Sequence, residues 1–183
     1  MDENLQNMSP EDAPFIRKEA FEWFDSIVFS VIAVVIALSF VFRIVGVDGT
    51  SMVPTLANSD RVVMWELGYQ PTTGDIVVVT KLQKPLIKRI IATGGQAVDI
   101  DFEAGVVYVD GVALDEPYVN EPTHRKEDVS FPLVVPEGYV FIMGDNRNWS
   151  SDSRTSTVGF VDERYVLGKV IFRILPLSQI GKI

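Results

Sequence analysis

The pattern of hydrophobic and polar residues changes once along the chain, close to residue 47. Residues 26–42 form a run without any charged side chain, and the apolar character continues beyond Arg43. The whole stretch reaches the ~20 apolar residues that a helix needs to cross a bilayer. The sequence therefore predicts one transmembrane helix over residues 26–47, preceded by an acidic segment over residues 1–25.

Two other structures can contain such a run, namely a buried core helix and a cleaved signal peptide. A core helix normally carries a polar stripe, whereas the only polar residues in this run are three serines. A signal peptide begins with a short basic region, but residues 1–25 contain seven Asp and Glu residues against Arg17 and Lys18. We therefore expect a single-pass anchor in the cell membrane, with lipid as its partner. Charge is a weak guide to orientation here, and we expect residues 1–25 in the cytoplasm.

Beyond the apolar run, short β-branched stretches are separated by turn residues, as in half-buried strands. The Asp-Gly pair at 110–111 is a strong hairpin signal. We expect a mainly β fold class, with a small barrel-like or sandwich domain over residues 48–183 on the extracytoplasmic face. Its polar stretch near 115–128 is expected to be an exposed loop. The predicted strands cover residues 61–66, 75–80, 86–92, 97–102, 106–109, 112–114, 129–135, 139–143 and 166–175.

Composition narrows the possible functions. Hydrophobic residues make up 47% of the 183 residues, which is enough to bury a core and excludes a disordered chain. The formal net charge of −9 argues against a surface that binds nucleic acid by neutralising phosphates. The chain has no Cys and a single His, which excludes thiolate metal sites and Cys nucleophiles. We expect no metal, no other cofactor and no nucleic-acid partner.

The segment VDGTSMVPTL, which follows the apolar run, has features of a site for a nucleophilic serine. Gly49 allows an unusual backbone conformation before Ser51, and Pro54 stiffens the chain after it. The hydroxyl is therefore expected on a bend rather than within a strand. The same residue types are also the commonest in ordinary turns, so this segment alone does not distinguish catalysis from a turn.

A nucleophilic serine needs a base, and the sequence offers three candidates. His124 lies in a polar stretch, a solvated setting that does not favour it. A lysine can act as the base when burial lowers its pKa. Lys88, within PLIKRIIA, and Lys169, within VLGKVIFRI, both lie among apolar residues. The pattern favours Lys88 without excluding Lys169, and either amine could instead reach water at a strand edge.

A third segment, MGDNRNWSSDSR at residues 143–154, follows a predicted apolar strand. Its concentration of Asp, Asn, Arg and Ser side chains is typical of a hydrogen-bonded support for a site, and also of a solvated turn. This segment becomes informative about function only through its order in the chain, after the serine segment and the lysine segment.

In this order, and behind a membrane anchor, the three segments resemble the bacterial type I signal peptidases, which are membrane-bound serine–lysine endopeptidases. The nucleophile motif S-M-x-P-T-L corresponds to residues 51–56, and the K-R motif to Lys88 and Arg89. The third motif, G-D-N-R-x-x-S-x-D-S-R, corresponds to residues 144–154. Gly49, two residues before the serine, and the single span are more similar to Gram-positive members.

The resemblance implies a Ser–Lys dyad. Ser51 is then the nucleophile, and Lys88 rather than Lys169 is the general base. The backbone N–H of Ser51 contributes to the oxyanion hole, with Thr50 as a second candidate contributor. After the K-R pair the family usually continues I-x-G-x-P-G-D, whereas this chain has IIATGGQ, so the geometry of that turn is not carried over.

The resemblance also implies supporting residues in the third motif. Ser150 orients the lysine amine by a hydrogen bond. Asp152 pairs with both Arg154 and Arg89, and these contacts hold the shape of the site.

The implied reaction removes N-terminal signal peptides from exported preproteins after an Ala-x-Ala-like site. The preprotein is expected to bind as an extended strand beside Ser51 and the strand that contains Leu86. Met52 and Ile87 are expected to form shallow apolar pockets that suit small side chains. The partners are therefore preproteins that carry a signal peptide.

Two other classes of protein share part of this pattern. A self-cleaving repressor also uses a Ser–Lys pair in a small β domain, but it carries a DNA-binding helical module where this chain has an apolar span. A membrane-anchored β domain that binds without catalysis becomes the better interpretation only if Ser51 or Lys88 is dispensable.

Overall fold

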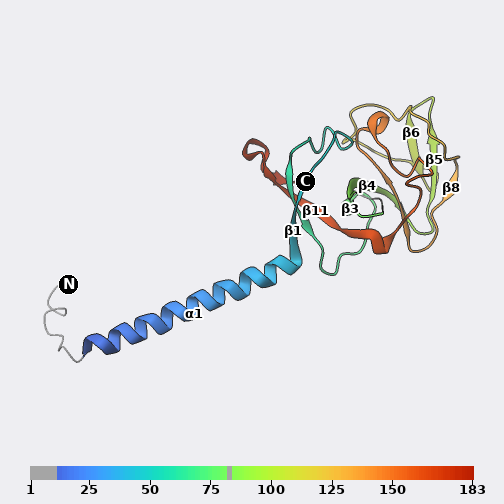
Figure 1. Cartoon of the computed structure of the whole chain (residues 1–183). Coiled ribbons are helices and arrows are strands. Elements are labelled where there is room, and N and C mark those ends of the chain that lie inside the picture. Colours follow the sequence, from blue (N-terminus) through green and yellow to red (C-terminus); the bar gives the residue numbers. More distant parts are fainter. Residues whose placement is uncertain (1–11, 82–83) are drawn as a thin grey trace. The chain divides into compact units, whose positions relative to one another are not determined.

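The structure, a computed structural model, describes residues 12–81 and 84–183, which belong to two units (Figure 1). The first unit is helical and ends at Val41, and the second comprises Phe42–Ile183. Of the predicted acidic segment, residues 1–11 lie outside the described residues, and the rest forms the beginning of the helix.

Helix α1 (Asp12–Val41) contains the apolar run. Its Phe21–Val41 part is long and apolar enough to cross a membrane, and none of that window is buried inside the structure. The three serine hydroxyls of the run each donate to a backbone carbonyl three or four residues earlier. They therefore need no partner outside the helix.

The predicted C-terminal boundary of the helix is wrong. Helix α1 ends at Val41, and the next residues form strand β1 (Phe42–Gly46), which pairs antiparallel with β2 (Arg61–Trp65). Ile44 lies opposite Val63, a β-branched pair that suits a pleated surface. Because both elements are apolar, hydropathy does not mark the point where helical hydrogen bonds give way to strand pairing.

Antiparallel sheets make up the second unit, which confirms the mainly β fold class. Among the described residues the larger sheet has eight strands in the order β1-β2-β11-β3-β4-β9-β10, with β12 paired to β11. The smaller sheet has the order β7-β6-β5-β8. The remaining strands are β3 (Ile76–Val79), β4 (Leu86–Thr93), β5 (Ala97–Asp101), β6 (Val106–Val109), β7 (Val112–Ala113), β8 (Leu133–Val134), β9 (Tyr139–Met143), β10 (Val161–Asp162), β11 (Val166–Leu175) and β12 (Gly181–Lys182). Short 3-10 helices are η1 (Arg147–Trp149), η2 (Glu163–Tyr165) and η3 (Leu177–Gln179).

Two apolar clusters determine where the site lies. One joins the two sheets, through side chains of β4 and β9 on one side and of β5 and β6 on the other. The second buries Met52 and Leu56 against the larger sheet, together with side chains of β2, β3 and β11. Burying a side chain of this size contributes about 1.5–3 kcal/mol, so the segment around the predicted nucleophile is firmly attached to the core.

One predicted strand is much shorter than expected, and besides β1 the strands β10 and β12 were not predicted. Of residues 129–135 only Leu133–Val134 pair as a strand. Pro132 has no N–H for a ladder, and the N–H of Val129 donates to the carbonyl of Arg154 instead. Strands β10 and β12 have two residues each, too few for an alternating pattern to reveal.

Candidate active site

Ser51 lies in a turn segment that connects β1 and β2. Gly49 has a φ of 95°, a left-handed conformation that residues with a Cβ atom disfavour. The sequence predicted an unusual backbone conformation at this glycine. Its N–H donates to Oδ1 of Asn58 at 2.9 Å. On the other side, Met52 and Leu56 are buried, and the N–H of Leu56 donates to the Met52 carbonyl at 2.9 Å. The segment is thus held at both ends, and the hydroxyl has a defined position.

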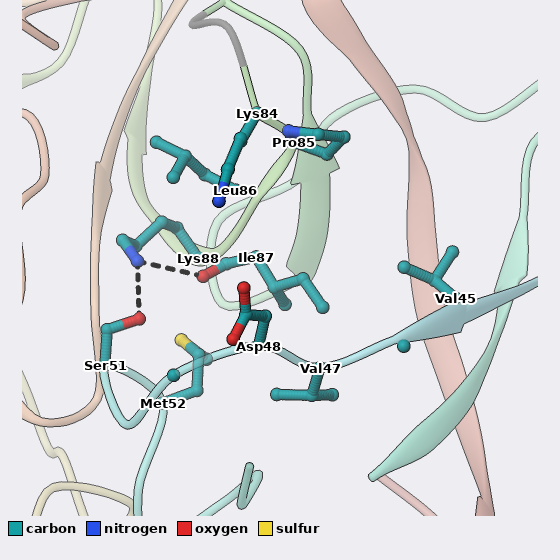
Figure 2. Close-up of a pocket in the computed structure, with 12 residues that line it drawn as sticks. Val45, Val47, Asp48, Ser51, Met52, Lys84, Pro85, Leu86, Ile87 and Lys88 are labelled. Atoms are coloured by element: carbon teal, nitrogen blue, oxygen red, sulfur yellow. Dashed lines mark hydrogen bonds between the residues drawn. The ribbon is translucent and has the colours of Figure 1, made fainter. Parts of the chain in front are cut away.

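Lys88 reaches Ser51 from strand β4 (Figure 2). Its Nζ lies 2.6 Å from Oγ of Ser51 and 3.2 Å from the carbonyl oxygen of Ile87. The lysine is only 3% exposed. Burial lowers the pKa of Lys88, and the carboxylates of Asp152 and Asp145 offset this only in part. Such an amine loses its proton more readily than an exposed lysine and can act as a base.

The two competing candidates for the base lie elsewhere. Lys169 on β11 forms an ion pair with Asp75, with 2.6 Å between Nζ and Oδ1. The Nδ1 atom of His124 lies 3.0 Å from the carbonyl oxygen of Phe102. Of the three candidates, the structure therefore brings only the lysine of β4 to the serine.

A groove of about 380 Å³ leads to the dyad (Figure 2). Residues 45–49 form one wall and residues 84–88 the other. The three residues predicted to bind substrate, Leu86, Ile87 and Met52, all line it. The groove therefore combines a reactive end with walls that are mostly apolar and carry two charged residues, Asp48 and Lys84.

Part of strand β4 has an edge that is free for pairing. Residues 86–89 pair with β3 on one side, whereas β9 pairs with β4 only from Arg89 onward. Within the described chain, residues 86–88 thus have no partner strand on their second side, which borders the groove. Unpaired backbone groups of this kind can accept an added strand.

Asp145 connects the nucleophile segment to the strand of the base. It is fully buried, and it accepts hydrogen bonds from Nε and Nη2 of Arg89 at 2.8 and 2.7 Å. It also accepts one from Oγ1 of Thr55 at 2.5 Å. Arg89 is the neighbour of Lys88 in strand β4, and Thr55 belongs to the same turn segment as Ser51. The Asp145 carboxylate therefore connects the strand of the base to the segment of the nucleophile.

The prediction that Asp152 pairs with Arg89 is wrong. Within residues 12–81 and 84–183, Asp152 forms an ion pair with Arg154 and none with Arg89; it lies 2.8 Å from Nε of Arg154 and also accepts from the N–H of Gly144 at 3.0 Å. In the register of β4 and β9, Arg89 lies opposite Met143. Asp145 is the first acidic residue after Met143. The strand pairing therefore places Asp145, and not Asp152, next to Arg89.

The predicted hydrogen bond between Ser150 and Lys88 is not formed. Ser150 is buried, and its Oγ has no hydrogen-bond partner among the described residues. The lysine amine is instead engaged by Ser51 and by the carbonyl of Ile87.

A second buried arginine is held by residues that the sequence did not single out. Arg147 is fully buried and forms a two-point ion pair with Glu116, at 2.6 and 2.8 Å. The hydroxyl of Tyr118 donates to the same Glu116, and its ring lies 3.8 Å from the guanidinium carbon of Arg89. Burial and the Glu116 carboxylate raise the pKa of Tyr118 to about 12, so the phenol keeps its proton. A lone aromatic in a polar segment is the signal that could have revealed this contact.

The stretch 115–128 is therefore not a simple exposed loop. Beyond the ion pair of Glu116, the Oδ1 atom of Asn148 accepts from the N–H groups of His124 and Arg125 at 3.0 and 2.9 Å. Asp128 accepts from the N–H of Ser156 at 2.7 Å. The stretch is attached to the third motif and to Ser156 just after it, because its polar groups form hydrogen bonds with residues distant in sequence.

Comparison with known proteins identifies the family of the chain. A family model described as "Signal peptidase, peptidase S26" matches residues 20–175. The chain belongs to this family. It is 38% identical to a probable signal peptidase I-1 of Synechocystis over 151 residues, which cover 75% of this chain and 73% of that protein. It is 32% identical to signal peptidase I of Bacillus licheniformis, with 96% of this chain and 99% of that protein covered.

Among solved structures, a crystal structure of a signal peptidase I from Enterococcus faecalis is 30% identical, with a TM-score of 0.48. It covers 55% of this chain and 97% of that one. The family predicted from the sequence motifs, including relatives in Gram-positive bacteria, is confirmed, and so is the class of enzyme, a serine endopeptidase of the S26 family. In the part of the chain that the structure describes, no group of three or more His, Asp and Glu side chains is arranged to hold a metal ion.

Proposed function

We propose that the chain is a membrane-anchored signal peptidase that removes N-terminal signal peptides from exported preproteins with a Ser51–Lys88 dyad. The observation that carries this proposal is the 2.6 Å separation between the buried amine and the serine hydroxyl at the end of the groove. The family supplies the reaction, and the geometry supplies a nucleophile next to a base.

The first half of the reaction is acyl transfer to the serine. The lone pair of the neutral Lys88 amine accepts the Ser51 proton while Oγ attacks the scissile carbonyl carbon. The negative charge that develops on the carbonyl oxygen is stabilised by the backbone N–H of Ser51, which donates to no other described residue. The lysine ammonium then protonates the departing amine, and the C–N bond breaks.

The second half returns the serine to its starting state. Lys88, neutral again, takes a proton from water, and the resulting nucleophile attacks the acyl-enzyme carbonyl. The acyl–oxygen bond breaks, and the proton passes back to Oγ of Ser51. One side chain thus serves as base and as acid in both halves.

Substrate recognition follows from the groove. A preprotein segment pairs as an added strand with the free edge at residues 86–88, and alternate side chains enter the groove. Leu86, Ile87 and Met52 give the groove apolar surface for these side chains. This arrangement supports cleavage after small residues in an Ala-x-Ala-like pattern.

Several supporting residues act by holding the dyad in place. Arg89 is fixed by Asp145, and Arg154 by Asp152. Ser150 has a buried hydroxyl without a partner among the described residues, and we propose that it becomes a partner of the lysine once the amine is protonated.

The anchor is the apolar part of α1. Phe21–Val41 corresponds to a helix length of about 30 Å, which equals the thickness of the hydrocarbon core of a bilayer. Its large apolar side chains are exposed in the structure, as expected for a helix that contacts lipid. We propose a single-pass protein of the cell membrane with the β unit on the extracytoplasmic face, where translocated preproteins emerge.

The test is cleavage of a preprotein with an Ala-x-Ala site by the full chain in membranes. We expect cleavage by the wild type and by Ser178→Ala, which changes an exposed serine of η3, and none by Ser51→Ala. We also expect Lys88→Arg to be inactive, because a guanidinium does not lose its proton, and Lys169→Arg to remain active. Cleavage by Ser51→Ala or by Lys88→Arg refutes the dyad.

Topology is tested separately with protease added to intact protoplasts. The β unit should be digested and the N-terminal segment protected. Complete protection of residues 48–183 refutes the proposed orientation.

A further inference from the structure

Asn146 contacts the backbone on both sides of the Ser51 α-carbon. Its side-chain Nδ2 donates to the carbonyl oxygen of Thr50 at 3.0 Å. Its backbone N–H donates to the carbonyl oxygen of Ser51, also at 3.0 Å. The Thr50 carbonyl accepts a further hydrogen bond, from the N–H of Val53 at 3.2 Å. Two consecutive peptide groups are thus anchored to one residue of the third motif.

The anchored oxygen of Thr50 belongs to the same peptide group as the N–H of Ser51. In a trans peptide the C=O and N–H bonds point in opposite directions within one plane. Fixing the oxygen therefore fixes the direction in which the N–H points, on the far side of that plane. Within the described residues this N–H donates to no acceptor, so it is available to an incoming oxyanion. A hydrogen bond to the oxygen of an amide also polarises its N–H, which strengthens it as a donor.

Asn146 is itself held in place by buried neighbours. On one side lies Asp145, fully buried and paired with Arg89, and on the other Arg147, whose Nε donates to the Gly144 carbonyl at 3.0 Å. The backbone of Gly144 is so close to the nucleophile segment that an added Cβ would lie 2.4 Å from the Ser51 carbonyl oxygen. Asn146 is therefore held firmly in place, and so is the Thr50–Ser51 peptide group that it contacts.

We propose that Asn146 is a positioning residue for the oxyanion hole, because it sets the orientation of the peptide group that carries the Ser51 N–H. It does not contact the reacting atoms and acts through the Thr50 carbonyl. The inference rests on the proposed function, in which this N–H stabilises the tetrahedral intermediate. It assigns to the side chain a role in the transition state rather than in substrate binding.

The test compares kinetics of the full chain and of two variants on a peptide with an Ala-x-Ala site. Asn146→Ala removes the side-chain donor, and Asn146→Asp keeps the size but replaces the donor with an acceptor. Loss of an oxyanion donor lowers kcat by about 100- to 1000-fold. We expect a smaller loss, about 10- to 100-fold, for Asn146→Ala, because the N–H itself remains and is only misplaced. KM should change by less than about threefold, and Asn146→Asp should be at least as impaired.

Asn148→Ala is the matched control. It removes hydrogen bonds to residues 122–125 but none to the Ser51 segment. We expect it to lower the melting temperature while kcat stays within about twofold of the wild type. The Asn146 variants should show the reverse, a large loss of kcat with little loss of melting temperature.

A peptide aldehyde with the same sequence gives a readout that a purely structural role would not change. Oγ of Ser51 adds to the aldehyde carbon, its proton passes to Lys88, and the aldehyde oxygen occupies the oxyanion position. We expect Asn146→Ala to bind the aldehyde more weakly by about the same factor as its loss of kcat, and to bind the matching peptide amide unchanged.

Unchanged kcat in both Asn146 variants, or equal losses of aldehyde and amide affinity, overturns the inference. These outcomes are distinct from a failure of the proposed function, in which the wild type does not cleave the peptide at all.

Discussion

Removing one partner of the ion pair between Arg89 and Asp145 should destabilise the β unit strongly, because the other charge is left without its partner. Replacing Asp145 with Asn keeps the shape of the side chain and removes its charge. Asp145 is fully buried and the Arg89 side chain is 11% exposed, so water can replace the lost partner only in part. The change also weakens the acceptor for Thr55 and thereby loosens the segment that carries Ser51.

The magnitude follows from what remains around the arginine. Breaking a buried pair typically costs ~3–5 kcal/mol of the free energy of unfolding. Here the guanidinium keeps the Tyr118 ring, 3.8 Å away, and a hydrogen bond to the Gly74 carbonyl at 2.8 Å. We therefore expect the lower end, about 3 kcal/mol. For a unit the size of Phe42–Ile183 this corresponds to a melting temperature lower by about 10 °C.

The assay is thermal unfolding of the full chain in detergent, followed by circular dichroism, with the cleavage rate measured on the same samples. Glu66→Gln is the matched control, since it breaks the Arg43–Glu66 pair, whose side chains are 58% and 34% exposed. An exposed pair contributes at most about 1 kcal/mol, so the control should melt within about 3 °C of the wild type. If Asp145→Asn also melts within that interval, the reasoning about the buried pair is wrong.

Three further predictions concern the dyad and its surroundings. Because burial lowers the pKa of Lys88, activity should rise with pH as the amine loses its proton and should persist in alkaline solution; a maximum on the acid side of neutrality contradicts this. In the pH range between the lowered pKa and the ordinary value for lysine, the unfolded chain binds more protons than the folded one, so the stability of the wild type should rise with pH. Lys88→Met should therefore be inactive yet more stable at neutral pH, with an advantage that shrinks as the pH rises, and urea titrations at several pH values measure it. Ser150→Ala removes a buried hydroxyl without a partner among the described residues, so the melting temperature should not fall while the cleavage rate does; full activity would show that this hydroxyl has no role.

The elements that the sequence predicted well are those set by local patterns. The apolar run forms a helix, the alternating stretches form most of the strands, and Gly49 takes the left-handed conformation that the nucleophile segment needs. Each of these depends on residues close together in the chain, so hydrophobic period and backbone preference are sufficient. The boundary at Val41 was missed because, apart from Arg43, the strand continues the apolar pattern of the helix.

What the tertiary structure decided is which side chains meet. Lys88 and Lys169 lie in similar apolar strands, and only the sheet order brings the former to Ser51 and the latter to Asp75.

Asp145 and Asp152 both lie in the third motif, and the register of β4 against β9 places Arg89 next to Asp145. Likewise, Glu116 and Tyr118 lie in a polar stretch whose sequence predicts a solvated loop. In the structure Glu116 pairs with Arg147, and the Tyr118 ring packs against Arg89. Ion pairs and hydrogen bonds act over a few ångströms in space between residues far apart in sequence, so the local pattern of hydrophobic and polar residues does not determine them.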